Sequence, residues 1–268
     1  MVIKMKREYF IIYVSVFFLS AVIIPILLFE VLESIQIKRM MVSTFFQVII
    51  FGGISYLLIR KHQIPLLKIK NKAKPLMGFI RIVFVSLVTF SLLRITRDSL
   101  HWIYVGFTGD SSIFIFPSAM NGGQFVIMVL FLGLVPSIFE ELFFRVISSH
   151  LLKEVKPERK ILLTALVFSL FHINAGLESL LISFFLGIIL MKCYDKRKNY
   201  IEVVGIHLFY NILVILFNNI LLFPTDAFLI NFWAGSPIEA LFIGSLLLTI
   251  PSIIFSTYLF KSNPKQKE

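Results

Sequence analysis

The chain has 268 residues, of which 58% are hydrophobic and only 15% are charged. Soluble domains contain about 45–50% apolar and about 25% charged residues, so the composition argues against a soluble protein and predicts an integral, multi-pass membrane protein. The net charge of +11 does not indicate a nucleic-acid partner, because the basic residues form short clusters between apolar runs, as in cytoplasmic loops. The single cysteine, Cys193, excludes an internal disulfide, a CxxC redox pair and a multi-cysteine zinc site.

Eight apolar stretches are candidate transmembrane helices, since about 20 apolar residues cross a bilayer core. In chain order they are Tyr9–Phe29, Met41–Ile59, Leu76–Leu93, Gln124–Leu152, Lys160–Ile173, Leu177–Met191, Tyr200–Leu222 and Ile238–Phe260. Proline and glycine residues in the flanks, such as Pro75, Pro157 and Gly176, are expected to break the helices. The sequence therefore predicts an all-α membrane helix bundle of about eight transmembrane helices, embedded in the lipid bilayer.

The basic residues predict the orientation of these helices. With eight spans, 20 of the 26 Lys and Arg residues fall in segments on one side of the membrane and 4 on the other, which places both termini in the cytoplasm. The longest outer segment, from Arg94 to Gly123, is expected to be a loop. A chain rich in Phe, Ile and Lys is expected in a bacterial cell membrane.

We expect three regions along the chain. Residues 1–123 contain the N-terminal transmembrane helices and the outer loop, and residues 124–222 contain a helical core. Residues 223–268 contain a C-terminal transmembrane helix and a basic tail.

Six charged, histidine or asparagine residues lie away from the ends of the predicted spans of the helical core. A charged side chain at the bilayer centre costs about 2.5–3.5 kcal/mol on insertion scales, so such residues are functional candidates. They are Glu140, Glu141 and Arg145 in the fourth span, His172 in the fifth, and His207 and Asn211 in the seventh.

Helical spacing separates the roles of the two adjacent acids. Glu141 and Arg145 are spaced i, i+4, so they can form an ion pair on one face. Glu140 projects about 100° away, and the residue four positions later is Phe144, which cannot neutralise it. The sequence therefore predicts that Glu140 is a buried carboxylate without a basic partner on its own helix.

The histidines and the asparagine add groups suited to hydrolysis. His207 and Asn211 share one face of the seventh span, and His172 shares a face with Phe168, which either lines a site or packs in the core. A buried glutamate beside a histidine can act as general base for water, while a histidine and an amide can donate hydrogen bonds to an oxyanion. With no serine or cysteine nucleophile evident, direct attack of water on a carbonyl is predicted.

Two alternatives stay open. Intramembrane histidine and asparagine residues often only bridge helices through hydrogen bonds worth about 0.6–2 kcal/mol, so the chain could be a non-catalytic immunity protein or regulatory scaffold. An ion-coupled transporter also uses buried acids and histidines, but the paired repeats typical of transporters are not evident in the sequence.

Three ordered motifs carry a resemblance to a known family. They are Glu140-Glu141-x-x-x-Arg145, Phe168-x-x-x-His172 and His207-x-x-x-Asn211. The set resembles the CPBP family of CAAX proteases and bacteriocin-processing enzymes (also called Abi or lysostaphin-resistance-protein-A-like), and is similar to CAAX prenyl endopeptidase type II. The resemblance covers about Gln124–Leu222.

The resemblance implies an intramembrane endopeptidase acting on a hydrophobic or lipid-proximal peptide, in CAAX-type or bacteriocin maturation. It implies that Glu140 with His172 activates water, and that His207 and Asn211 hold the oxyanion. Glu141, Arg145 and Phe168 would then be structural. Family members are labelled metalloproteases, and Glu140, His172 and His207 are the alternative Zn²⁺ ligands. Because HExxH is absent and a neutral amide is a poor ligand, we predict that no metal is required.

Overall fold

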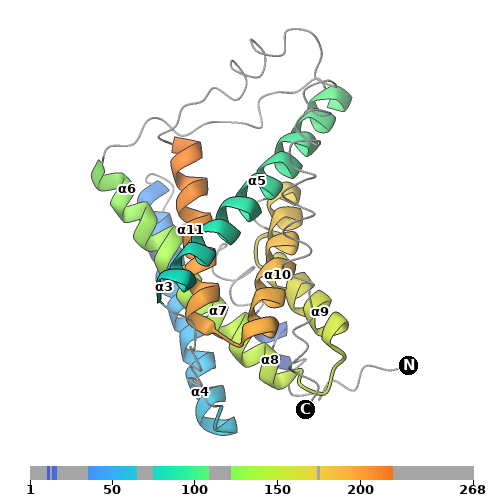
Figure 1. Ribbon diagram of the computed structural model, residues 1–268. Helices are drawn as coiled ribbons and strands as arrows, with labels where there is room; N and C mark the ends of the chain where they lie inside the picture. The colour runs from blue at the N-terminus through green and yellow to red at the C-terminus, as the bar shows by residue number, and fades with distance from the viewer. Residues whose placement is uncertain are drawn as a thin grey trace.

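The described part of this computed structural model consists of helices joined by short turns, and no strand occurs in residues 11–12, 14–16, 36–64, 75–108, 122–173 and 176–219 (Figure 1). This confirms the predicted all-α fold. The elements are α3 (Gln36–Gln47), η2 (Val48–Gly52), α4 (Gly53–His62), α5 (Pro75–Thr108), α6 (Gly122–Met128), η3 (Val129–Leu134), α7 (Val135–Glu141), η4 (Leu142–Ile147), α8 (Ser148–Leu151), α9 (Pro157–Leu170), α10 (Leu177–Arg197) and α11 (Tyr200–Asn219). The η elements are π-helical.

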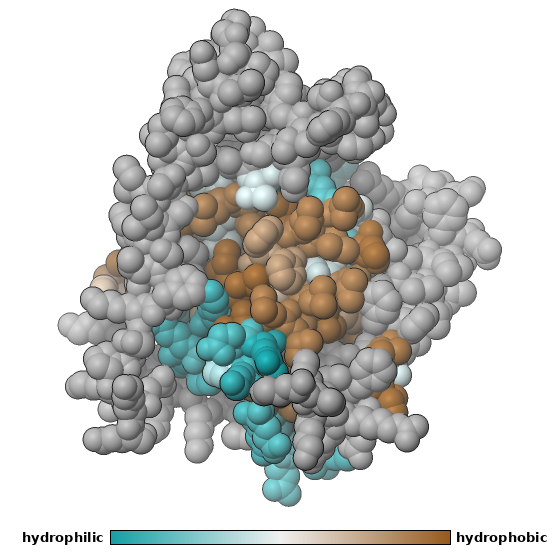
Figure 2. Space-filling view, turned by 90° about the vertical axis from the view of Figure 1, so that its right-hand side faces the viewer, coloured by the Kyte–Doolittle hydropathy of each residue, from teal (hydrophilic) through white to brown (hydrophobic). Residues whose placement is uncertain are grey.

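Within the described residues, four helices are long and apolar enough to cross a membrane. They are Thr44–His62, Leu76–Arg94, Gly122–Leu151 and Leu177–Arg197, and a shorter apolar helix covers Tyr200–Leu216. Figure 2 shows apolar side chains gathered over the middle of one face, with hydrophilic residues along its lower edge. The molecule is therefore an integral membrane protein.

Two of the eight predicted spans, Tyr9–Phe29 and Ile238–Phe260, lie wholly or mostly outside the described residues. The total number of spans and the cytoplasmic placement of both termini therefore remain predictions. The fifth predicted span corresponds to α9, which has 14 residues and rises only about 21 Å. Since the hydrocarbon core is about 30 Å thick, α9 does not cross it alone.

The helix from Pro75 is longer than the sequence predicted. The sequence predicts a loop from Arg94 to Gly123, but α5 continues past Arg94 to Thr108. The whole helix has 34 residues. The residues from Phe79 to Val105 include no glycine or proline that would end the helix. An ion pair also supports the extension, because Arg97 Nε lies 2.7 Å from Glu178 Oε1 in the first turn of α10.

Proline and glycine residues that are evident in the sequence mark the starts of three helices. Pro75 and Pro157 are the first residues of α5 and α9, positions where the missing N–H has no helical partner to lose. Gly176 precedes α10 with a φ of +94°, a conformation that a residue with a Cβ rarely adopts. The predicted breakers at these positions are confirmed.

Aromatic packing joins the N-terminal helices to the rest of the bundle. The ring centroid of Phe51 lies 5.5 Å from those of Phe143 and Phe144, and 5.3 Å from that of Phe171. Phe51 has only 1% of its surface exposed. The helix containing η2 and α4 therefore forms one wall of the core that supports η4.

The helix Gly122–Leu151 departs twice from the α-helical hydrogen-bonding pattern. The π-helical segments η3 and η4 lie on either side of α7, whose last two residues are Glu140 and Glu141. Pro136 contributes to the irregularity, because it has no N–H to donate to the carbonyl of Leu132. Single-turn π segments inside α-helices frequently mark functional sites, and here they bracket the two buried acids.

Candidate active site

The two acids at the end of α7 are both buried, but their partners differ. Glu140 has 6% of its surface exposed and Glu141 has none. Adjacent residues on a helix project about 100° apart, so the two carboxylates meet different neighbours. One acid is therefore fully paired with neighbouring side chains, and the other keeps its carboxylate oxygens open to a further hydrogen-bond donor.

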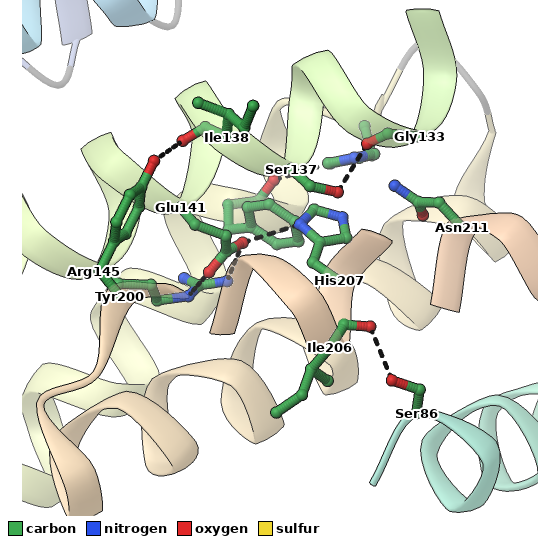
Figure 3. Close-up of polar contacts among 12 residues, drawn as sticks. Ser86, Gly133, Ser137, Ile138, Glu141, Arg145, Tyr200, Ile206, His207 and Asn211 are labelled. Atoms are coloured by element: carbon green, nitrogen blue, oxygen red, sulfur yellow. Dashed lines mark hydrogen bonds and ion pairs between the residues drawn. The ribbon is translucent and has the colours of Figure 1, made fainter. Parts of the chain in front are cut away.

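Glu141 is bound on both of its oxygens. Arg145 Nε lies 2.7 Å from Glu141 Oε2, and both side chains are fully buried, so the predicted i, i+4 pair is present. His207 Nδ1, from α11, lies 2.9 Å from Glu141 Oε1. Figure 3 shows the three side chains converging from two helices. The sequence did not predict His207 as the third member of this network.

The neighbouring acid Glu140 lacks such partners. Within the part of the chain that the structure describes, no hydrogen bond or ion pair joins its carboxylate to another group. His172 and His207 are nevertheless close enough to act on it electrostatically. A buried carboxylate that is near two imidazoles but shares no direct bond with them has free acceptor sites for a water molecule.

His172 lies in the turn after α9 rather than within the helix. The predicted fifth span extended to Ile173, but α9 ends at Leu170. The backbone N–H of His172 donates to Ser169 O at 2.9 Å, and His172 Nδ1 lies 3.0 Å from Phe168 O. Since a carbonyl oxygen only accepts, Nδ1 carries the proton of this bond, and Nε2 of the neutral ring is left as an acceptor.

Phe168 forms a fully buried surface between the polar groups. Its ring centroid lies 4.8 Å from that of His172 and 6.0 Å from that of His207. Arg145 Cζ lies 4.9 Å from the same centroid, within the range of a cation–π contact. The two alternatives raised by the sequence, core packing and lining of the site, are therefore compatible.

Asn211 is anchored to the backbone of the helix opposite. Its Nδ2 donates to Leu132 O at 3.1 Å, the carbonyl whose α-helical donor is missing at Pro136. An amide nitrogen carries two hydrogens, so one remains available. Nearby, Ser137 Oγ donates to Gly133 O at 2.7 Å, as Figure 3 shows.

Sequence reasoning missed Tyr200 among the polar residues of this region. Its hydroxyl donates to Ile138 O at 2.7 Å, and it lies at the first position of α11. The available signal was its spacing, because residues 200, 207 and 211 recur at intervals of 7 and 4 along one helical face. From the sequence alone, this position is predicted only as the start of a span.

The donor set does not fit a metal centre. Across the described segments, no group of three or more His, Cys, Asp and Glu side chains is arranged to hold a metal ion. The alternative zinc ligands Glu140, His172 and His207 therefore do not form such a group. We assign no reaction step to a metal, and independence from metal remains a prediction.

Comparison with known proteins identifies the segment that contains all of these groups. The Rce1-like family model, described as type II CAAX prenyl endopeptidase Rce1-like, matches residues 122–213. The matched segment contains all three motifs and agrees with the resemblance inferred from them. Neither the curated proteins nor the solved structures include a match to the chain. The similarity of the chain to the Rce1-like family therefore covers residues 122–213, the segment that holds the candidate site.

Proposed function

We propose that the protein is an intramembrane endopeptidase that hydrolyses a peptide bond of a hydrophobic or lipid-proximal substrate, with Glu140 activating water. The observation that carries the proposal is the contrast between the two adjacent buried acids. Glu141 is satisfied by Arg145 and His207, whereas Glu140 has no hydrogen-bonding partner among the described residues. A buried carboxylate with free acceptor sites is suited to hold and deprotonate water.

In the proposed reaction, Glu140 and His172 share the activation of one water molecule. His172 donates Nδ1–H to Phe168 O, so its Nε2 can accept a hydrogen bond from that water. As the water oxygen attacks the substrate carbonyl, one proton passes to Glu140. The same proton is then delivered to the leaving amine as the peptide C–N bond breaks, which returns Glu140 to its carboxylate form.

His207 and Asn211 are proposed to stabilise the oxyanion. Glu141 holds His207 through Nδ1, and a carboxylate in this position orients an imidazole. Protonated His207 can donate Nε2–H to the developing charge. Asn211 can donate the amide hydrogen that does not bind Leu132 O. Fixed donors of this kind stabilise a developing charge strongly in a site that excludes water.

The test replaces the carboxylate of Glu140 with an amide of nearly the same shape. We expect Glu140→Gln to reduce processing of a co-expressed membrane peptide by at least a hundredfold at unchanged protein abundance, the lower range for loss of a general base. Glu158→Gln, an exposed acid in the first turn of α9, is the matched control and should retain full activity. Full activity of Glu140→Gln would exclude this mechanism.

A second function is supported by the same contacts. The bonds from His207 to Glu141 and from Asn211 to Leu132 O join α11 to the helix opposite, which a non-catalytic immunity or scaffold protein of this fold would also need. Such a protein would retain its phenotype in the Glu140→Gln variant. The substrate class, whether CAAX-type or a maturing bacteriocin or peptide, is part of the proposal, as is a bacterial cell membrane.

A further inference from the structure

One face of α11 makes three polar contacts with the helix Gly122–Leu151. His207 binds the Glu141 carboxylate, Asn211 binds Leu132 O, and Tyr200 Oη donates to Ile138 O at 2.7 Å. The first two residues belong to the motif already discussed. Tyr200 lies outside it and touches neither acid by hydrogen bonding.

The carbonyl that Tyr200 binds lies at a structural junction. Ile138 is two residues before Glu140, and the α-helical pattern of α7 gives way to the π-helical pattern of η4 after Glu141. The N–H of Leu142 also donates to Ile138 O, so this carbonyl accepts from the backbone and from a side chain of another helix. The hydrogen bond from Tyr200 to Ile138 O therefore forms only when the junction between α7 and η4 lies at this place in the chain.

The position of the junction determines the direction of the acids. If the π-helical segment moved by one residue along the chain, the residue that the junction passes would change its direction by about 100°. Such a change at Glu141, the last residue of α7, would turn its carboxylate away from Arg145 and His207 and would disturb the position of the adjacent Glu140. A bond from a separate helix to Ile138 O opposes this movement.

We propose that Tyr200 is a positioning residue for Glu140, acting through Ile138 O to hold the junction between α7 and η4 in place. The inference rests on the proposed function only in treating Glu140 as the general base. Tyr200 itself does not touch the reacting atoms. Its hydroxyl, rather than its ring, carries the effect.

The experiment compares Tyr200→Phe with Tyr194→Phe in the full-length protein reconstituted into vesicles. Tyr194, in the neighbouring helix α10, is the control because it is a buried tyrosine whose hydroxyl has no hydrogen bond within the described residues, whereas Tyr200 is partly buried. The probe is a fluorogenic peptide with a farnesylated CAAX end. Kinetics give kcat and KM separately, and hydrogen–deuterium exchange reports on the backbone amides of residues 135–147.

For Tyr200→Phe we expect kcat to fall about threefold to tenfold, as for loss of one hydrogen bond, with KM unchanged. Exchange in residues 135–147 should rise, whereas Tyr194→Phe should match the unmodified protein in both measurements. Unchanged exchange in Tyr200→Phe would overturn the inference. If the unmodified protein does not cleave the probe, the substrate proposed for it fails, and the exchange measurement alone still decides the role of Tyr200.

Discussion

The fully buried ion pair between Glu141 and Arg145 provides a quantitative test of the site's architecture. Arg145→Met keeps most of the side-chain length but removes the cation. Glu141 then has His207 Nδ1 as its remaining partner at 2.9 Å. Phe168 also loses the guanidinium, whose Cζ lies 4.9 Å from its ring centroid. The variant therefore leaves a buried carboxylate largely uncompensated.

Removing one partner of a buried ion pair costs about 3–5 kcal/mol. In a protein of this size, about 1 kcal/mol corresponds to about 2–4 °C in the unfolding temperature, so Arg145→Met should lower it by about 6–20 °C. Replacing both partners restores neutrality. We therefore expect the double variant Glu141→Gln, Arg145→Met to be more stable than the sum of the single effects, with a coupling of about 1–3 kcal/mol.

Cys193 makes the measurement possible without labels introduced by mutation. It is the single cysteine of the chain and has 5% of its surface exposed, so a thiol-reactive fluorogenic dye should react with it only as the protein unfolds. Heating detergent-solubilised protein with the dye gives the unfolding temperature of each variant. Strictly additive single and double effects would refute the reasoning, since they would mean that the two charges do not depend on each other.

Two further predictions concern packing and metal. Gly187→Ala should lower the unfolding temperature by several degrees in the same dye assay, because the added Cβ would lie 3.0 Å from Ala165 Cα, and overpacking costs about 1–3 kcal/mol. Ser183→Ala on the same helix is its control. A zinc chelator should leave cleavage by the purified protein unchanged; loss of cleavage that added Zn²⁺ restores would instead favour the ligands Glu140, His172 and His207.

Several features of the fold followed from simple signals in the sequence. Long apolar runs predicted the spans, and Gln124–Leu152 differs from the observed Gly122–Leu151 by only a residue or two at each end. Helix ends at Pro75 and Pro157 were predictable because proline is tolerated at the first helical position. The extension of α5 to Thr108 was not predictable from hydropathy, since it is supported by a contact between Arg97 and the distant Glu178.

The polar site was predictable in part. The i, i+4 rule predicted the pair of Glu141 with Arg145 and left Glu140 without a basic partner on its helix. The rule assumes an uninterrupted α-helix, and it describes contacts within one helix and not contacts between helices. It therefore missed the π-helical segments around α7, and it missed the contacts that α11 makes through Tyr200 and through the bond of His207 to Glu141.

The bond between His207 and Glu141 changes how the two acids of the motif should be viewed. Glu141 was expected to be structural because Arg145 neutralises it, and that pair is present. Yet the same carboxylate also accepts a hydrogen bond from His207 Nδ1 at 2.9 Å, and so holds the orientation of the ring in the proposed oxyanion contact. Arg145 binds the other oxygen of this carboxylate at 2.7 Å and fixes its position. The ion pair that stabilises the bundle therefore also positions His207, the proposed oxyanion donor. A change at Glu141 should consequently affect both stability and catalysis.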